Sequence, residues 1–525
     1  MRIDGDFQVE INIKDHKLTN KHERKKEGLE NSPVFPASVY RETVLEQVFA
    51  DAKRYFLHPL LQIEYAHTLM LARQGIMPRS EAATCIRALE SLDPTEVLDA
   101  KYDESFEDLF FFIEKKLATE CGAEIAGKMH TARSRNDIDL TMYRMVLRDL
   151  VAQTLEALIA LRTLFSDLAW EHRRALIPAY THNQPAQPTT LGHYLMAFIE
   201  ILERDSERLM EAHSRVNRCP LGACAITTTG FPIDRHFTEQ LLGFKGLQLN
   251  SYGAIAAVDY LTECSSVLAV CMVNLGRFTQ DLLFWSTVEF NFIRLSDAYV
   301  QISSIMPQKR NPVPLEHVRI LASRAFTQAQ SILGCVHNTP FTDMNDAEDD
   351  LQPLAYSAFE DADRSLRLLA GILSEAEFNT ARMAASADDN FLSVTELADT
   401  LVRTTGISFQ AAHHLVSGAV KELTNTGTGY DRDAMTAIIV RDLPAIATRP
   451  QAITREQIRE SLDAQHFVHV RQIPGGPAAK VLEPDILRAQ GQIAADRSWL
   501  DAVNAHLENA NVLLRREREE LLKLD

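Results

Sequence analysis

The chain has 525 residues, of which 46% are apolar, and it carries a formal charge of −18. This acidic balance excludes a broad nucleic-acid-binding surface, which depends on clustered Lys and Arg, but it leaves room for a small cationic pocket. Seven scattered cysteines without C-x-x-C spacing indicate reduced thiols rather than a disulfide framework or a zinc site. We expect no metal and no cofactor, because the sequence contains no motif for either.

The N-terminal residues 1–36 are highly charged, with the run 22–27 as the clearest example, and they lack an apolar signal core. We expect a loosely ordered arm here. No window approaches the apolar run of about 18 residues that a membrane span requires. The sequence therefore predicts a cytoplasmic protein with no membrane and no nucleic-acid partner.

Helical periodicity dominates the rest of the chain. Apolar residues recur at spacings of three and four through several long segments, namely 39–117 with a stop at Gly75, 138–176, 195–216, 254–283, 315–333 and 354–373. From residue 387 prolines divide shorter helices, and a last helix is expected from Pro484. We predict a mainly α fold with three domains: a helical domain with a charged arm at 1–131, a central long-helix bundle at 132–386, and a small helical domain at 387–525. Several of these helices are apolar nearly all round, which indicates a bundle and an oligomer.

A polar segment precedes the first long bundle helix, over residues 130–137, with the sequence H-T-A-R-S-R-N-D. Ser134, Arg135 and Asn136 offer a hydroxyl, a guanidinium and an amide at a helix start, where free backbone N–H groups and the helix dipole also favour an anion. The alternative is ordinary helix capping by Asn136 or Asp137. The sequence alone leaves both interpretations open.

A second polar segment, Y-T-H-N-Q-P-A-Q-P over residues 180–188, lies between two predicted long helices. An isolated histidine is more often structural than catalytic, but His182 beside Thr181 in a proline-bounded loop favours a site. The tight turn 220–223, P-L-G-A, allows close approach of the backbone and is a weak feature by itself.

The third segment, residues 303–312, has the sequence S-S-I-M-P-Q-K-R-N-P. Pro307 and Pro312 fix the backbone and stop regular structure, so we expect a rigid loop between helices. Two hydroxyls with Lys309 and Asn311 suit an anion, because Lys is a point charge and Asn is a neutral donor. An ordinary connector between helices is the alternative.

These segments together resemble the fumarase/aspartase superfamily, whose loop has the form S-S-x-M-P-x-K-x-N-P. The forms H-T-G-R-S-R-N-D, Y-T-H-x-Q-x-A-Q-P and P-L-G-x-x-A point to its argininosuccinate lyase branch, and Ala132 replaces the glycine here. The resemblance covers about 58–485. It implies a homotetramer with a pooled central bundle, active sites shared by three subunits, and an activity that needs no metal or cofactor.

The resemblance also implies roles for individual residues in a small-molecule site that forms fumarate from a succinyl-amine adduct. Ser304 would be the general base that removes the Cβ proton, and the resulting aci-carboxylate would be stabilised by preorganised donors. His182 and Thr181 would complete the catalytic set, with His182 orienting carboxylates or carrying a proton. The residues implied in binding the carboxylates or shaping the loop are Ser134, Arg135, Asn136, Ser303, Met306, Lys309 and Asn311.

The resemblance is weaker on the amine side of the site. Argininosuccinate lyases carry Y-N-R-D-L-Q-E-D-K-E-P-L, where this chain has Asp343 for Tyr, Glu348 for Gln and Leu351 for Lys. A pocket that gains carboxylates and loses a Lys should not bind the amino-acid carboxylate of argininosuccinate in the usual way. Asp343 and Glu348, if they face the pocket, suit a diamine or polyamine.

We therefore expect a carbon–nitrogen lyase acting on another N-substituted aspartate, similar to the ethylenediamine-disuccinate lyases of the same branch. Argininosuccinate lyase activity is the main alternative. A fumarase or aspartase is less favoured, because H-T-A-R-S-R-N-D points to the argininosuccinate side. An inactive structural homologue of the δ-crystallin type is a minor alternative, because Ser304 and Lys309 are intact.

Overall fold

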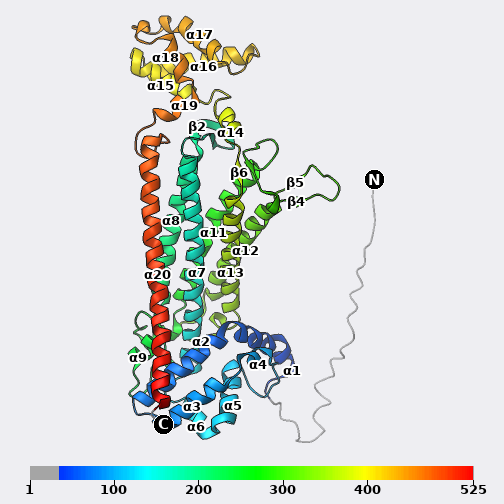
Figure 1. Cartoon of the computed structure of the whole chain (residues 1–525), viewed down its shortest axis with the longest axis vertical. Coiled ribbons are helices and arrows are strands. Elements are labelled where there is room, and N and C mark those ends of the chain that lie inside the picture. Colours follow the sequence, from blue (N-terminus) through cyan, green and yellow to red (C-terminus); the bar gives the residue numbers. More distant parts are fainter. Residues whose placement is uncertain (1–34, 524–525) are drawn as a thin grey trace.

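The computed structural model describes residues 35–523, and the expected arm lies almost wholly outside the described residues. A bundle of long helices forms the body, with smaller groups of helices at its two ends (Figure 1). The described strands form three two-stranded antiparallel sheets. The prediction of a mainly α fold is confirmed. The domain boundaries at 131/132 and 386/387 stay predictions.

The N-terminal helices gather at one end of the bundle (Figure 1). Gly75 has a φ of +68° and follows the end of α2, as the sequence predicts. Asp93 and Asp108 cap α4 and α5 by accepting backbone N–H groups. The elements of this end are α1 (Ser38–Tyr40), the π-helical segment η2 (Arg41–Leu45), α2 (Glu46–Arg73), α3 (Arg79–Ser91), α4 (Pro94–Asp99), α5 (Leu109–Cys121) and α6 (Ala123–Lys128).

The body of the molecule consists of α7 (Arg135–Glu171), α8 (Leu191–Val216), α11 (Asp259–Trp285), α12 (Val313–Val336), α13 (Gln352–Ser374) and α20 (Ala479–Lys523). Helix α7 packs against α8, α13 and α20 and supplies fully buried side chains such as Leu155, Leu158 and Phe165. Burial on several sides explains why this helix is apolar nearly all round. The core of the protein therefore runs along α7.

Helix α11 contradicts the prediction that no segment is apolar enough to span a membrane. By length and composition alone, this helix is long and apolar enough to cross a membrane. Half of its most apolar stretch is buried inside the protein, against α8 and α12. The apolar composition of α11 is therefore accounted for in part by packing in the bundle.

Short elements connect the long helices: β1 (Leu176–Thr181), β2 (Gln184–Thr190), α9 (Arg235–Leu241), α10 (Ser251–Ala256), β3 (Ile293–Arg294), η3 (Asp297–Tyr299), β4 (Gln301–Ile302), β5 (Arg310–Asn311), η4 (Asn345–Ala347) and β6 (Glu377–Phe378). The helix expected over 138–176 ends at Glu171 instead. The backbone beyond it bonds to the start of α8, with Gly192 N–H donating to the His172 carbonyl at 3.1 Å.

Residues 380–469 form shorter helices at the other end of the bundle (Figure 1). A separate apolar core runs from Leu397 to Leu462. The elements are α14 (Thr380–Ala387), α15 (Val394–Thr405), α16 (Phe409–Asn425), α17 (Arg432–Asp442), η5 (Leu443–Ala445), η6 (Pro450–Ala452), α18 (Arg455–Ser461) and α19 (Ala464–His469). The last helix begins at Ala479 rather than at Pro484, so that Pro484 lies inside the helix.

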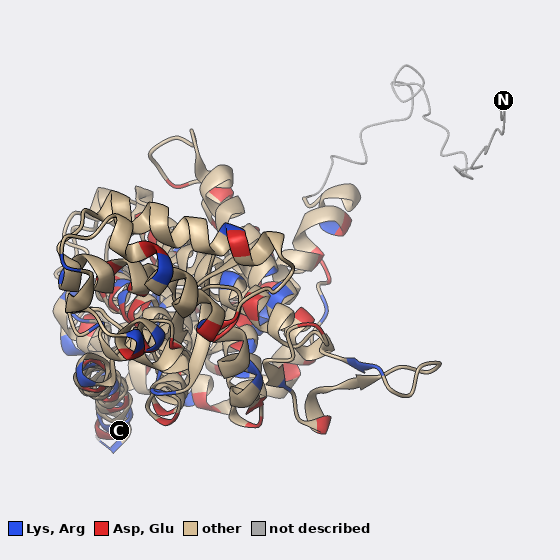
Figure 2. Cartoon of the chain, turned by 90° about the horizontal axis from the view of Figure 1, so that it is seen from above, with Lys and Arg blue, Asp and Glu red and all other residues tan. Residues whose placement is uncertain are grey.

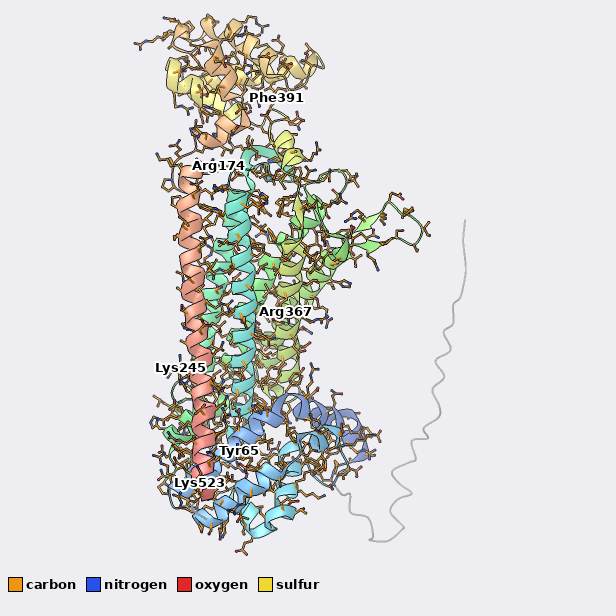
Figure 3. All side chains as sticks on the ribbon, viewed as in Figure 1. Tyr65, Arg174, Lys245, Arg367, Phe391 and Lys523 are labelled. Atoms are coloured by element: carbon orange, nitrogen blue, oxygen red, sulfur yellow. The ribbon has the colours of Figure 1, made fainter. Side chains whose placement is uncertain are left out.

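Helix α20 returns along the whole bundle and ends beside the N-terminal helices (Figure 3). There the Arg518 guanidinium lies 3.8 Å from the ring centre of Tyr65. Midway, Arg162 of α7 forms a buried ion pair with Asp496 of α20 and donates to Ser206 of α8 at 3.0 Å. Both charged side chains are almost completely inaccessible to water. Three helices are thus joined at a polar point inside the apolar core.

Removing one member of this pair should destabilise the bundle strongly. We expect Asp496→Ala to lower the free energy of unfolding by about 3 kcal/mol, because the buried Arg162 charge keeps only the more distant carboxylate of Glu203, 3.8 Å away. Urea unfolding measures the change, and Asp501→Ala, an exposed position on the same helix, is the matched control. Equal stability of the two variants would contradict the role of the pair.

Candidate active site

The start of α7 is held by the buried carboxylate of Asp137. Its Oδ1 accepts the backbone N–H of Ser134 at 2.9 Å, and its Oδ2 accepts those of Gly222 and Cys224 at 2.7 and 2.9 Å. Ser134 is the N-cap residue of α7. The alternative prediction that Asn136 or Asp137 is the N-cap residue is therefore wrong. Asp137 instead joins the helix start to the turn at 220–223, where Gly222 has a φ of +89°.

A cavity of about 460 Å³ lies beside this helix start. We call it the acidic cavity, because seven Asp and Glu residues are found among the described residues that line it. Arg135 also lines it. Five residues predicted from the sequence meet here, although Asp343 and Glu348 lie more than two hundred positions from the others. They are Ser134, Arg135, Asn136, Asp343 and Glu348.

Arg135 and Asn136 of the acidic cavity are already engaged by neighbouring groups. The Arg135 guanidinium forms ion pairs with Glu107 at 3.2 Å and Asp108 at 3.0 Å. The Asn136 amide donates to Asp343 Oδ2 at 2.6 Å and to the Ala225 carbonyl at 3.2 Å. Positive charge in the cavity is therefore engaged by carboxylates.

Crowding of carboxylates affects their protonation. Burial, followed by the hydrogen bond and charge of Asp343, raises the pKa of Glu348 to about 8. Burial, and then the charge of Asp349, raises the pKa of Asp139 well above its ordinary value. Burial also raises the pKa of Asp349, although Tyr143 donates a hydrogen bond to its Oδ1 at 2.6 Å. The cavity therefore holds protons near neutral pH that isolated carboxyl groups would lose.

Five of the seven acidic residues are not predicted from the sequence as site residues: Glu107, Asp108, Asp139, Asp349 and Asp350. Asp139 follows Arg135 by four positions, a spacing that places both on one face of α7. That spacing could have identified it. Residues of the N-terminal segment, among them Tyr40 and Val44, also line the cavity, and nothing in their composition indicates this.

Thr181 and His182 lie at the tip of an exposed hairpin formed by β1 and β2. His182 and Asn183 have φ values of +53° and +59°, as in the two-residue turns that suit the twist of a hairpin. This segment, expected as a loop between helices, is thus a pair of strands with an irregularity at Ala179 and Tyr180. Neither Thr181 nor His182 lines the acidic cavity.

The loop 303–309 projects from the side of the bundle between β4 and β5 (Figure 2). Ser303 Oγ accepts the backbone N–H of Met306 at 3.0 Å, and the Met306 carbonyl accepts that of Lys309 at 3.0 Å. Asn311 donates its side-chain amide to the Gln301 carbonyl at 3.0 Å, which closes the base of the loop. Ser304 and Lys309 are exposed.

The three predicted polar segments do not meet within one chain. Helix α7 has 37 residues, so at about 1.5 Å per residue Asn136 lies about 55 Å from the far end of that helix. The hairpin with Thr181 comes after that far end in the chain. Arg174, which lies just before the hairpin, is labelled at that end of the bundle in Figure 3. The loop with Ser304 precedes α12 and lies towards the hairpin end (Figure 1). A site containing all three needs more than one copy of the chain.

Comparison with known proteins identifies relatives along most of the chain. Residues 72–327 match a family model described as lyase, and residues 391–469 match the argininosuccinate lyase C-terminal model. The chain is 42% identical to argininosuccinate lyase 2 of Agrobacterium fabrum over 463 residues, covering 88% of this chain and 92% of that protein. It is 37% identical to the argininosuccinate lyase of Methanoculleus marisnigri, with the same shares covered.

Solved structures give the same result. EDDS lyase in complex with formate superimposes with a TM-score of 0.81 at 32% sequence identity, covering 93% of this chain and 96% of that one. A variant of EDDS lyase with bound fumarate gives the same values. The fold and the loop at 303–312 define a member of the fumarase/aspartase superfamily. Within it, the chain belongs to the argininosuccinate lyase branch, and it is a carbon–nitrogen lyase.

The raised pKa of Glu348 predicts a pH-dependent cost in stability. Between the ordinary pKa of 4.5 and about 8 the folded protein retains a proton that the unfolded chain has lost, so stability falls as pH rises through this window. We expect Glu348→Gln to raise the free energy of unfolding by about 1–2 kcal/mol at pH 9 and to have little effect at pH 5. Thermal unfolding at both pH values measures it.

Glu377→Gln, at an exposed position, is the control and should change stability equally little at both pH values. A Glu348→Gln variant with the same stability difference at pH 5 and pH 9 would show that Glu348 titrates normally.

Proposed function

We propose that this protein eliminates an amine from an N-substituted aspartate to give fumarate, and that argininosuccinate is not its preferred substrate. The observation that carries the proposal is the acidic cavity, where Asp343 and Glu348 lie together with Ser134, Arg135 and Asn136. The first two residues belong to the expected amine side, and the other three to the expected carboxylate side. One cavity thus offers both halves of such a site.

In the proposed reaction Ser304 removes a proton from Cβ of the succinyl group. The electron pair forms a dianionic aci-carboxylate, which then expels the amine from the neighbouring carbon and leaves fumarate. A serine hydroxyl can act as this base only where cations and N–H groups stabilise its alkoxide. Ser303, Lys309 and Asn311 would hold the carboxylate that gains charge.

The second carboxylate of the substrate would bind to Ser134, Arg135, Asn136 and Thr181. His182, at the exposed tip of the hairpin, would orient the carboxylates or carry a proton to the leaving amine. Met306 would shape the loop, where its carbonyl accepts the N–H of Lys309. No step in this scheme requires a metal or a cofactor.

We further propose that the complete site forms in a homotetramer, from residues of three subunits. Support comes from the distances within one chain and from apolar side chains exposed on neighbouring helices. Val270 and Val273 of α11 and Ile320 and Leu333 of α12 are more than two-fifths exposed. Helical faces of this kind are normally covered by other helices.

Argininosuccinate lyase activity is the second candidate, because the relatives at 42% and 37% identity carry that name. The amine side of the cavity argues against it. Leu351, which takes the place of the expected Lys, is buried in the core. The Asp343 carboxylate would repel the amino-acid carboxylate of argininosuccinate, and Glu348 offers it no positive charge.

A panel of aspartates substituted at nitrogen with different amines distinguishes the two candidates. Fumarate absorbs in the ultraviolet, so its release is followed directly. We expect kcat/KM for at least one aminoalkyl-substituted aspartate to exceed that for argininosuccinate by about tenfold or more. Argininosuccinate as the fastest substrate would establish the second candidate, and no release from any adduct would favour an inactive homologue.

The base is tested by Ser304→Ala, which we expect to lower kcat by about 10³-fold or more, since proton abstraction is lost. Gln308→Ala is the matched control, because Gln308 is exposed in the same loop and occupies a variable position of the motif. Full activity of the Ser304→Ala protein would refute the assignment.

Sharing of the site is tested by mixing two inactive proteins, Ser304→Ala and Asn136→Ala, after partial denaturation and reassembly. If each site takes these residues from different subunits, random mixing restores about a quarter of the sites. Each protein refolded alone is the control. No recovery of activity in mixtures that form tetramers would contradict a shared site.

A further inference from the structure

The hydrogen bond between Asn136 and Asp343 occupies the amide that the proposed function needs for a carboxylate. One amide N–H points to Asp343 and the other to the Ala225 carbonyl, while the amide oxygen accepts from Ser134 Oγ at 2.9 Å. An amide nitrogen carries two hydrogens, so Asn136 has none left to give. A substrate carboxylate must therefore displace one of these two acceptors before it can bind to Asn136, and of the two only Asp343 is a side chain that can turn away.

A dicarboxylate that enters this cavity alone should bind weakly. Arg135 is already paired with Glu107 and Asp108, and further carboxylates line the walls. Bringing two more negative charges into a partly enclosed space of low dielectric is unfavourable unless positive charge accompanies them. A cation that carries N–H groups would supply the positive charge that the dicarboxylate needs.

Two further groups in the cavity suit such a cation. Asp139 faces the cavity and receives no hydrogen bond from the residues that the structure describes, whereas Asp137 on the same helix receives three. Glu348 lies within hydrogen-bonding reach of Asp343. An alkylammonium group carries three N–H donors and a full charge. It could take the place of the Asn136 amide on Asp343 and turn its remaining donors to these neighbours.

We propose that Asp343 is a specificity and positioning residue that holds Asn136 until a terminal ammonium of the substrate's amine half replaces it. Asn136 is then free to donate to the dicarboxylate half. This inference rests on the proposed function and names its substrate class: aspartates whose nitrogen carries an aminoalkyl chain. In the direction of synthesis the diamine binds first and fumarate second.

The test measures fumarate binding by calorimetry to the full-length Ser304→Ala protein, in which no turnover disturbs the equilibrium. Fumarate is titrated alone and in the presence of saturating 1,3-diaminopropane. We expect the diamine to tighten fumarate binding by at least about tenfold, through added positive charge and release of Asn136. Propylamine, which has one charge, should tighten it less.

The decisive variant adds Asp343→Ala to the same protein. Fumarate alone should then bind about threefold tighter or better, because Asn136 is free and one negative charge is gone, and the diamine should no longer help. A merely structural role for Asp343 would weaken binding instead. Asp346→Ala is the matched control, since Asp346 is exposed in the same segment and does not line the cavity.

Two results overturn the inference while leaving the proposed function intact. One is fumarate binding that the diamine does not tighten, and the other is diamine-dependent tightening that persists without Asp343. Fumarate that binds to none of these proteins, with or without the diamine, would overturn the inference together with the proposed function. The two failures are therefore distinguishable.

Discussion

The carboxylate of Asp137 is the constraint on which the candidate site depends. It is buried at the first turn of α7 and accepts three backbone N–H groups, two of them from the turn around Gly222. Because a buried carboxylate is tolerated only with such partners, the helix start and the turn are fixed relative to each other. Asn136 is then placed between the Ala225 carbonyl and Asp343. A shift of Asp137 would therefore move the donors at the start of α7, namely Ser134, Arg135 and Asn136.

The opposite wall of the cavity explains how a family member can change its amine while it keeps its chemistry. Residues 343–349 connect α12 to α13, so substitutions there leave the bundle core untouched. Burial, followed by the hydrogen bond and charge of Asp343, raises the pKa of Glu348 to about 8, so Glu348 retains a proton at neutral pH. Burial also raises the pKa of Asp349. On the proposed function, a cationic amine half would displace the Glu348 proton as it binds. The amine would then be selected by electrostatics, independently of the loop that carries Ser304.

The sequence predicted the fold class, the long helices and five residues of the acidic cavity, because helical periodicity and a long specific motif are local signals. It did not predict the hairpin at Thr181 and His182, since a proline-bounded segment suits a loop equally well. It also missed Asp139 and Asp349, because clustering of carboxylates depends on how α7 packs against the connection after α12. The start of the last helix was misplaced at Pro484, because a proline normally marks a helix start, whereas here the helix continues through it from Ala479.

The exposure of Ser304 in a single chain bears on how this residue could act as a base. In one chain its loop projects from the bundle, and Ser304 is exposed. A serine hydroxyl surrounded by water ionises only far above neutral pH, so the alkoxide required of a base needs cations and N–H donors beside it. Ile302 and Ile305, which flank the two serines, are more than three-quarters exposed, as expected of a loop that docks against another surface. If the start of α7 in another subunit supplies that surface, docking would bring the N–H donors of that helix start, Asn136 among them, to the substrate. Assembly would then be the step that turns Ser304 into a base.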